Sequence, residues 1–180
     1  MAFPPEDIIP IVTRISDILK ERKQTLSISE SACGGLISSY IVSVPGASSC
    51  YLGSTLTYSL KSRLKLSGWS EEDIQSYTGP SEDVALRLAR NLKYELGSTY
   101  TLSETGWAGP TGVDGASSEG VGTVYLAIVG PTGQPKKTHK DLRSFSSFNA
   151  HDRAGNMAEF AKLALEFLLD YLLEQETTSA

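Results

Sequence analysis

The chain has little of the side-chain chemistry on which metal sites and disulfide frameworks depend. Its 180 residues include only two cysteines, Cys33 and Cys50, and two histidines, His139 and His151, with no Cys-x-x-Cys pair. A zinc site built from histidine and cysteine is therefore disfavoured, and so is a disulfide framework. We expect a reduced protein, and we predict no cofactor.

Long apolar runs and an excess of basic residues are also lacking. No stretch has the roughly 18 uninterrupted apolar residues of a membrane-spanning helix. The first residues lack the basic and apolar character of a secretory signal, so we expect a cytoplasmic protein. The formal net charge is -5, which argues against nucleic acid or an acidic membrane as a partner.

Helical and strand-like patterns alternate along the first two thirds of the chain, and two strand-like segments follow each other near the end. Helices are predicted over about 5–23, 34–44, 60–65 and 81–96, with a further helix start at 70–73 and a long terminal helix whose apolar face runs from 157 to 172. Strands are predicted over 25–29, 50–58, 99–103, 121–129 and 136–145. This order predicts an α/β fold, a three-layer α/β/α sandwich with a mixed sheet and helices on both faces.

The length and the absence of a linker predict one domain over residues 1–180. Its core is expected over about 8–172, with a frayed polar tail from 174 to 180. The segment 112–120 is expected to be a polar loop.

Several common catalytic motifs are absent. There is neither a Gly-x-Gly-x-x-Gly fingerprint after the first strand nor a Walker Gly-Lys-Ser/Thr motif. A Ser-His-Asp triad would need one of the two histidines. His151 precedes Asp152 at the start of the last helix, where an ordinary surface or capping role competes with that of a base.

Two glycine-rich stretches, 30–35 and 105–112, each follow a strand-like run. Glycine lets a ligand approach the backbone closely and leaves N–H groups available for an anion. Two such turns in a short α/β chain predict a pocket for a phosphate- or carbonyl-bearing small molecule.

Six short motifs then occur in a characteristic order. They are Glu30-Ser31-x-x-Gly34-Gly35, Pro45-Gly46-Ala47-Ser48, Thr57-Tyr58-Ser59, Gly79-Pro80-Ser81, Thr105-Gly106-x-Ala108-Gly109-Pro110-x-Gly112 and Val121-Gly122-Thr123-Val124. Over about residues 8–172 the chain resembles the CinA C-terminal domain, the nicotinamide-nucleotide amidohydrolase (PncC-type) family.

The resemblance implies hydrolysis of the amide of nicotinamide mononucleotide, which gives nicotinic acid mononucleotide and ammonia. It also implies a serine nucleophile, a catalytic lysine, no metal and a homodimer. Carried over by motif, Ser48 is the expected nucleophile, and Ser31, Tyr58 and Thr105 are expected in the pocket. The turns expected around the nucleotide contain Gly34, Gly35, Gly106, Ala108 and Gly109.

The chain departs from the family pattern at several positions. The family lysine of Thr-Tyr-Ser-x-x-x-Lys is Arg63 here, and arginine stays protonated in proteins. Lys61 and Lys65 lie on other sides of a helix and do not replace it. Arg63 is still expected at the site, since a planar guanidinium can hold a phosphate or carboxylate.

Other departures lie in the glycine-rich turn, before Val121 and near the C-terminus. Ala32 and Cys33 replace a Cys-Thr pair, Glu119 stands where the family has a cation, and Met157 replaces a second arginine. Arg153 is then the remaining candidate for a ligand phosphate.

Each candidate also has a purely structural interpretation. Ser31 and Ser48 suit capping positions, Tyr58 suits a strand, Thr105 suits a turn, Arg63 suits a solvated helix face, and Cys33 suits a buried spacer rather than a reactive thiol. Three functions stay open: the amidohydrolase, a nucleotide-binding or regulatory protein without hydrolysis, and a hydrolase of a different amide or phosphorylated substrate.

Overall fold

The computed structural model describes residues 3–132 and 134–178. Its helices are α1 (Ile9–Glu21), α2 (Leu36–Val42), α3 (Leu60–Leu66), α4 (Glu71–Gln75), α5 (Glu82–Leu96) and α6 (Arg153–Thr178), with short 3-10 turns η1 (Ala47–Ser49) and η2 (Leu142–Ser144). Its strands are β1 (Leu26–Glu30), β2 (Tyr51–Leu56), β3 (Tyr100–Gly106), β4 (Thr123–Val129) and β5 (Pro135–Asp141).

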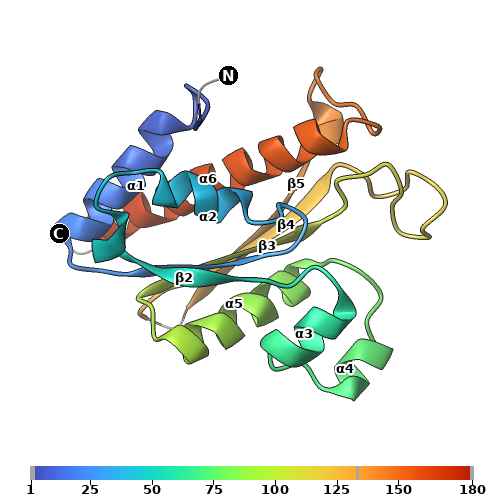
Figure 1. Cartoon of the computed structure of the whole chain (residues 1–180), viewed down its shortest axis with the longest axis horizontal. Helices are drawn as coiled ribbons and strands as arrows, with labels where there is room; N and C mark the ends of the chain where they lie inside the picture. The colour runs from blue at the N-terminus through green and yellow to red at the C-terminus, as the bar shows by residue number, and fades with distance from the viewer. Residues whose placement is uncertain (1–2, 133, 179–180) are drawn as a thin grey trace.

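The strands form one mixed sheet in the order β2-β1-β3-β4-β5. β1 is parallel to both β2 and β3, whereas β4 is antiparallel to β3 and to β5. Helices α1, α2 and α6 cover one face, and α5 covers the other (Figure 1). The predicted α/β fold with a mixed sheet and helices on both faces is confirmed.

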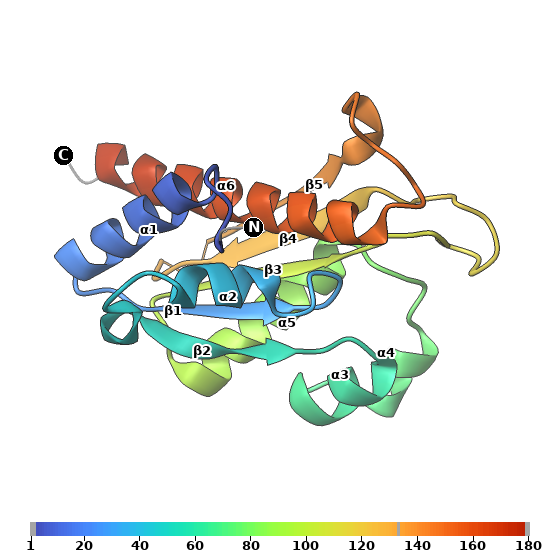
Figure 2. The same cartoon turned by 45° about the horizontal axis from the view of Figure 1, so that its top comes forward.

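The main core lies between the sheet and the layer formed by α1, α2 and α6 (Figure 2). It contains fully buried residues from α1, the central strands and α6, such as Ile15, Ile28, Leu102 and Phe160. Ala85 and Ala89 of α5 pack against Ala127 on the opposite face. Small side chains there let α5 approach the sheet closely.

Several predicted boundaries differ from those of the structure. α1 begins at Ile9 rather than at residue 5, because an earlier start would place Pro10 inside the helix, where its missing N–H breaks the hydrogen-bond ladder. β5 ends at Asp141, whose side chain accepts from Arg143 N–H and begins η2. α6 continues to Thr178 instead of fraying from residue 174.

Basic residues occupy distinctive positions in β5 and α3. β5 is an edge strand with Lys137, His139 and Lys140 exposed, which is typical of protected sheet edges. In α3 the buried residue is Arg63, whereas Leu60 and Leu66 are exposed. Helical periodicity predicts Leu60 and Leu64 as the apolar face of this helix, but Leu60 is exposed and a cation is buried instead.

We predict that Gly106→Ala destabilises the protein because β3 and β4 are too close at this position for a side chain. A Cβ on Gly106 would lie 2.4 Å from the Thr123 carbonyl oxygen. Overpacking of this kind costs about 3 kcal/mol. A matched control is Gly97→Ala, where nothing lies within 4 Å and only the φ of +64° is unfavourable, at a cost of about 1 kcal/mol.

Urea denaturation of both variants and the wild type measures these free energies of unfolding. An equal loss in the two variants would contradict the close approach of β3 and β4.

Candidate active site

A cavity of about 320 Å³ lies where the parallel strands β1, β2 and β3 end. Ser31 directly follows β1, Tyr58 follows β2 by two residues, and Thr105 and Gly106 end β3. Ligands commonly bind at the carboxyl ends of such strands, and the volume is typical of a small-molecule pocket.

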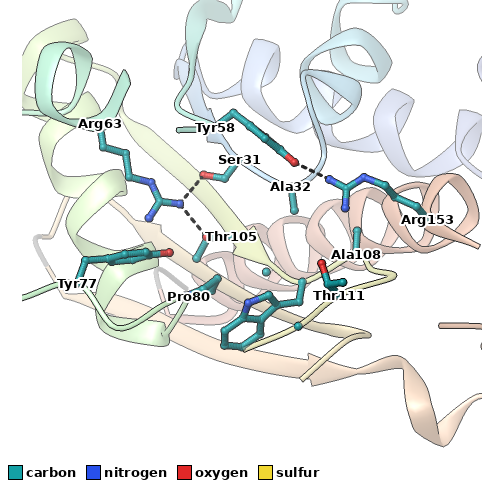
Figure 3. A pocket seen from close by; sticks show the side chains of 13 residues that line it. Ser31, Ala32, Tyr58, Arg63, Tyr77, Pro80, Thr105, Ala108, Thr111 and Arg153 are labelled. Atoms are coloured by element: carbon teal, nitrogen blue, oxygen red, sulfur yellow. Dashed lines mark hydrogen bonds between the residues drawn. The ribbon is translucent and has the colours of Figure 1, made fainter. Parts of the chain in front are cut away.

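The cavity brings together seven of the residues that the sequence predicts for the site. They are Ser31, Tyr58, Arg63, Thr105, Gly106, Ala108 and Arg153. Figure 3 shows Arg63, Ser31 and Thr105 grouped together, with Tyr58 and Arg153 forming a separate group. The pocket therefore has a cation in each group.

Ser48 does not line this cavity, so the structure does not bring the predicted nucleophile together with Tyr58 and Thr105. It is exposed in η1, which immediately precedes β2, whereas Tyr58 follows the same strand. The six residues of β2 separate the two positions by about 20 Å at strand spacing. The order of motifs along the sequence does not reveal at which end of a strand a loop lies.

Gly34 and Gly35 do not line the cavity either. Both have positive φ, +66° and +97°, and lead into α2. The Glu30 carboxylate accepts hydrogen bonds from the N–H groups of Gly35, Ile37 and Ser38 at 2.8–3.1 Å. The anion site expected at this helix N-terminus is thus occupied by the protein's own side chain.

Arg153 comes from the first turn of α6 and reaches the mouth of the pocket. Its Nη2 donates to the Tyr58 hydroxyl at 2.8 Å, and its Nη1 donates to the Gly109 carbonyl oxygen. Gly109 itself does not line the cavity. It contributes by holding the Arg153 guanidinium, so its predicted role in direct substrate contact is not seen.

Arg63 is only 3 % exposed and joins the two hydroxyls of the inner group. Its Nη2 donates to Ser31 Oγ at 3.4 Å and to Thr105 Oγ1 at 3.2 Å, and its Nε donates to the Thr57 carbonyl oxygen at 3.4 Å. Ser31 Oγ donates to the same carbonyl at 3.2 Å. No partner of the Ser31 hydroxyl in the described structure is a base.

Two aromatic residues that sequence reasoning did not single out support this guanidinium. Its central carbon lies 5.3 Å from the Trp69 ring centroid and 4.9 Å from that of Tyr77, within the range of cation–π contacts. Tyr77 stands two residues before the Gly79-Pro80-Ser81 motif, which was a usable signal. Trp107 lines the cavity as a further flat wall.

Glu104 is a buried residue behind the pocket that the motifs did not reveal. Its Oε2 accepts from the N–H groups of Ser31 and Cys33 at 3.1 and 3.0 Å, and its Oε1 is buried without a partner. Burial, with a smaller contribution from Glu30, raises the pKa of Glu104 to about 7. Burial also raises the pKa of the Cys33 thiol, which agrees with a structural spacer.

The remaining candidates take no part in the pocket. His151 is exposed and does not line it. Among the described residues, no group of three His, Cys, Asp or Glu side chains is placed to hold a metal ion. No helix in the described part of the chain has the length and apolar character needed to cross a membrane.

The sequence model of the CinA C-terminal domain family matches residues 9–172. The chain belongs to the CinA C-terminal domain family. CinA-like proteins of Chlorobaculum tepidum and Salinibacter ruber are 35% and 34% identical to it, over 90% and 84% of this chain. The chain spans only 37% and 34% of the length of these two relatives.

Solved structures of CinA proteins have the same fold. A competence/damage inducible protein, CihA from Agrobacterium tumefaciens, superposes with a TM-score of 0.82 at 25% identity, over 94% of this chain and 98% of its own. A CinA superfamily protein from Escherichia coli gives 0.79 at 21% identity, over 96% and 94%. The CinA fold is thus kept while the sequence varies widely.

We predict that Glu104 makes the stability of this CinA domain depend on pH. Because burial raises the pKa of Glu104 from its ordinary value of 4.5 to about 7 in the folded protein, the folded state holds the proton more tightly. The stabilisation is complete below the unfolded pKa and is lost as the pH rises through 7. The loss is on the order of 3 kcal/mol.

Glu104→Gln should remove this part of the pH dependence, as measured by urea denaturation between pH 4.5 and 8. Glu119→Gln, at an exposed position, is the control and should keep the wild-type profile. A wild-type profile in Glu104→Gln would show that Glu104 titrates normally.

Proposed function

We propose that this CinA domain hydrolyses the amide of nicotinamide mononucleotide, with the Ser31 hydroxyl as the nucleophile. The observation that supports the proposal is the contact of Arg63 Nη2 with both Ser31 Oγ and Thr105 Oγ1 inside the cavity. Ser31 is the only serine among the residues that line the cavity. It takes the role that the family resemblance assigned to Ser48.

The reaction would proceed through an ester on Ser31. Its oxygen attacks the carboxamide carbon, the C–N bond breaks, and ammonia leaves with the hydroxyl proton. Water then hydrolyses the ester to the acid and regenerates the hydroxyl. Arg63 stabilises negative charge on the tetrahedral intermediate, and the Thr105 hydroxyl provides a second donor nearby.

The rest of the cavity suits the rest of the nucleotide. Trp107 offers a flat surface for the pyridine ring. Arg153, at the mouth beside Tyr58, offers a cation for the phosphate. The ligand then extends from Arg63 to Arg153 with its amide next to Ser31.

We predict that the wild-type protein releases ammonia from nicotinamide mononucleotide and that Ser31→Ala does not, because the attacking oxygen is gone. Ser48→Ala is the matched control and should keep the wild-type rate, since Ser48 lies at the other end of β2. A coupled ammonia assay measures all three proteins. Loss of activity in Ser48→Ala with activity retained in Ser31→Ala would reverse the assignment.

A second function, ligand binding without hydrolysis, is favoured by Arg63. Lysine can take a proton when burial lowers its pKa, but a guanidinium stays protonated and does not activate the hydroxyl. Under this alternative the wild type binds nicotinamide mononucleotide, as detected by calorimetry, and releases no ammonia. Under the first function, the absence of a base beside Ser31 among the described residues predicts slow turnover.

We predict that Arg63→Lys raises ammonia release by about 10²-fold, the usual contribution of a positioned general base. The same assay at equal protein concentration measures the change. An unchanged or lower rate would show that the missing amine does not limit the reaction. The homodimer and the cytoplasmic location expected from the sequence stay predictions.

A further inference from the structure

Arg63 is a buried cation without an anion. Within residues 3–132 and 134–178, none of the ion pairs involves it. Its Nη1 is buried and has no hydrogen-bond partner, although the residue lines the cavity. Buried charges are normally paired and buried N–H groups normally bonded, because the loss of hydration is costly. The missing partner is expected in the ligand.

The bonds that Arg63 does make are to neutral groups and are long. Its three acceptors are two hydroxyls and one carbonyl, at 3.2–3.4 Å. Charge-assisted bonds to a carboxylate are shorter, about 2.7–2.9 Å. Both hydroxyls can turn to donate to an arriving anion. The inner end of the cavity therefore holds donors for which the protein supplies no negative charge.

The aromatic neighbours hold the guanidinium at the inner end of the cavity. The Trp69 and Tyr77 rings pack against the guanidinium, so its free hydrogen-bonding direction is along its edge. A planar carboxylate can meet that edge with two parallel bonds. A phosphate can form the same two bonds, so competition with inorganic phosphate is part of the test below.

We propose that the inner end of the cavity binds a carboxylate on the ligand ring in preference to a carboxamide. The inference rests on the proposed function, which places the ring at Trp107 and the phosphate at Arg153. It adds that the acid form of the nucleotide binds more tightly than the amide form. A carboxamide offers one oxygen and directs its own NH2 group at the Arg63 donors. The acid that hydrolysis would produce pairs with the guanidinium instead, so the product is retained.

The test compares the dissociation constants of nicotinic acid mononucleotide and nicotinamide mononucleotide for the wild-type protein by calorimetry. Because turnover is expected to be slow, the titration is completed before much amide is hydrolysed, and an ammonia assay run in parallel measures how much is lost. The acid should bind about tenfold more tightly, a difference of about 1.4 kcal/mol. Equal affinities, or a preference for the amide, would overturn the inference while leaving nucleotide binding intact.

Arg63→Gln removes the charge and should bring the ratio of the two constants close to one. Arg87→Gln is the matched control, because Arg87 also stacks on Trp69, at 5.1 Å, but does not line the cavity. It should keep the wild-type ratio. If Arg63→Gln does not fold, the ratio of the two dissociation constants in the wild-type protein still tests the inference.

Two further measurements separate the remaining explanations. Saturating inorganic phosphate should weaken both nucleotides equally, and a ratio that falls to one would assign Arg63 to phosphate and overturn the inference. If neither nucleotide binds, the proposed function fails. Thermal-shift measurements with free nicotinate and nicotinamide then test the carboxylate site by itself. Stabilisation by nicotinate alone supports that site, and equal shifts with the two compounds reject it.

Discussion

Two buried carboxylates determine the shape of the pocket. Glu30 binds three backbone N–H groups at the start of α2, and Glu104 binds those of Ser31 and Cys33. Together the two carboxylates accept hydrogen bonds from the backbone N–H groups of the turn that joins β1 to α2. Ser31 is therefore held in one backbone position at the end of β1, and the wall of the cavity is built on that fixed point.

This arrangement changes the source of positive charge for a ligand. In many nucleotide sites the N–H groups of a glycine-rich turn hold the phosphate. Here the carboxylates of Glu30 and Glu104 bind the N–H groups of the turn, so the positive charge for a ligand has to come from cationic side chains. Arg63 and Arg153 provide it from different segments, α3 and α6. A ligand with two anionic groups fits such a pair better than a ligand with one.

The sequence predicted most of the fold because its strands and helices alternate clearly and the motifs fall at strand ends. Ser31, Thr105 and Arg153 were found through the family motifs. Ser31 and Thr105 lie together because parallel strands bring their carboxyl ends together, whereas Arg153 comes from the start of α6. Ser48 was expected beside Tyr58 because the order of motifs does not tell at which end of a strand each loop lies. Glu104 was missed because it lies beside Thr105 on a buried strand, where no pattern distinguishes a structural acid from a functional one.

The burial of Arg63 could not be predicted from α3 alone. Its neighbours in the helix are leucines, and helical periodicity assigns the buried face to them. The guanidinium is accommodated because Trp69 and Tyr77 lie nearby and hydroxyls from β1 and β3 surround its edge. These contacts join segments distant in sequence.

The segment from Tyr58 to Pro80 has a consequence for how such a protein changes over time. It carries Arg63 together with both of its aromatic supports, and it connects β2 to α5 outside the sheet (Figure 1). Mutations there can retune ligand preference without disturbing the strands or the Glu30 and Glu104 contacts. This segment can thus change over evolution while the sheet and its packing stay the same.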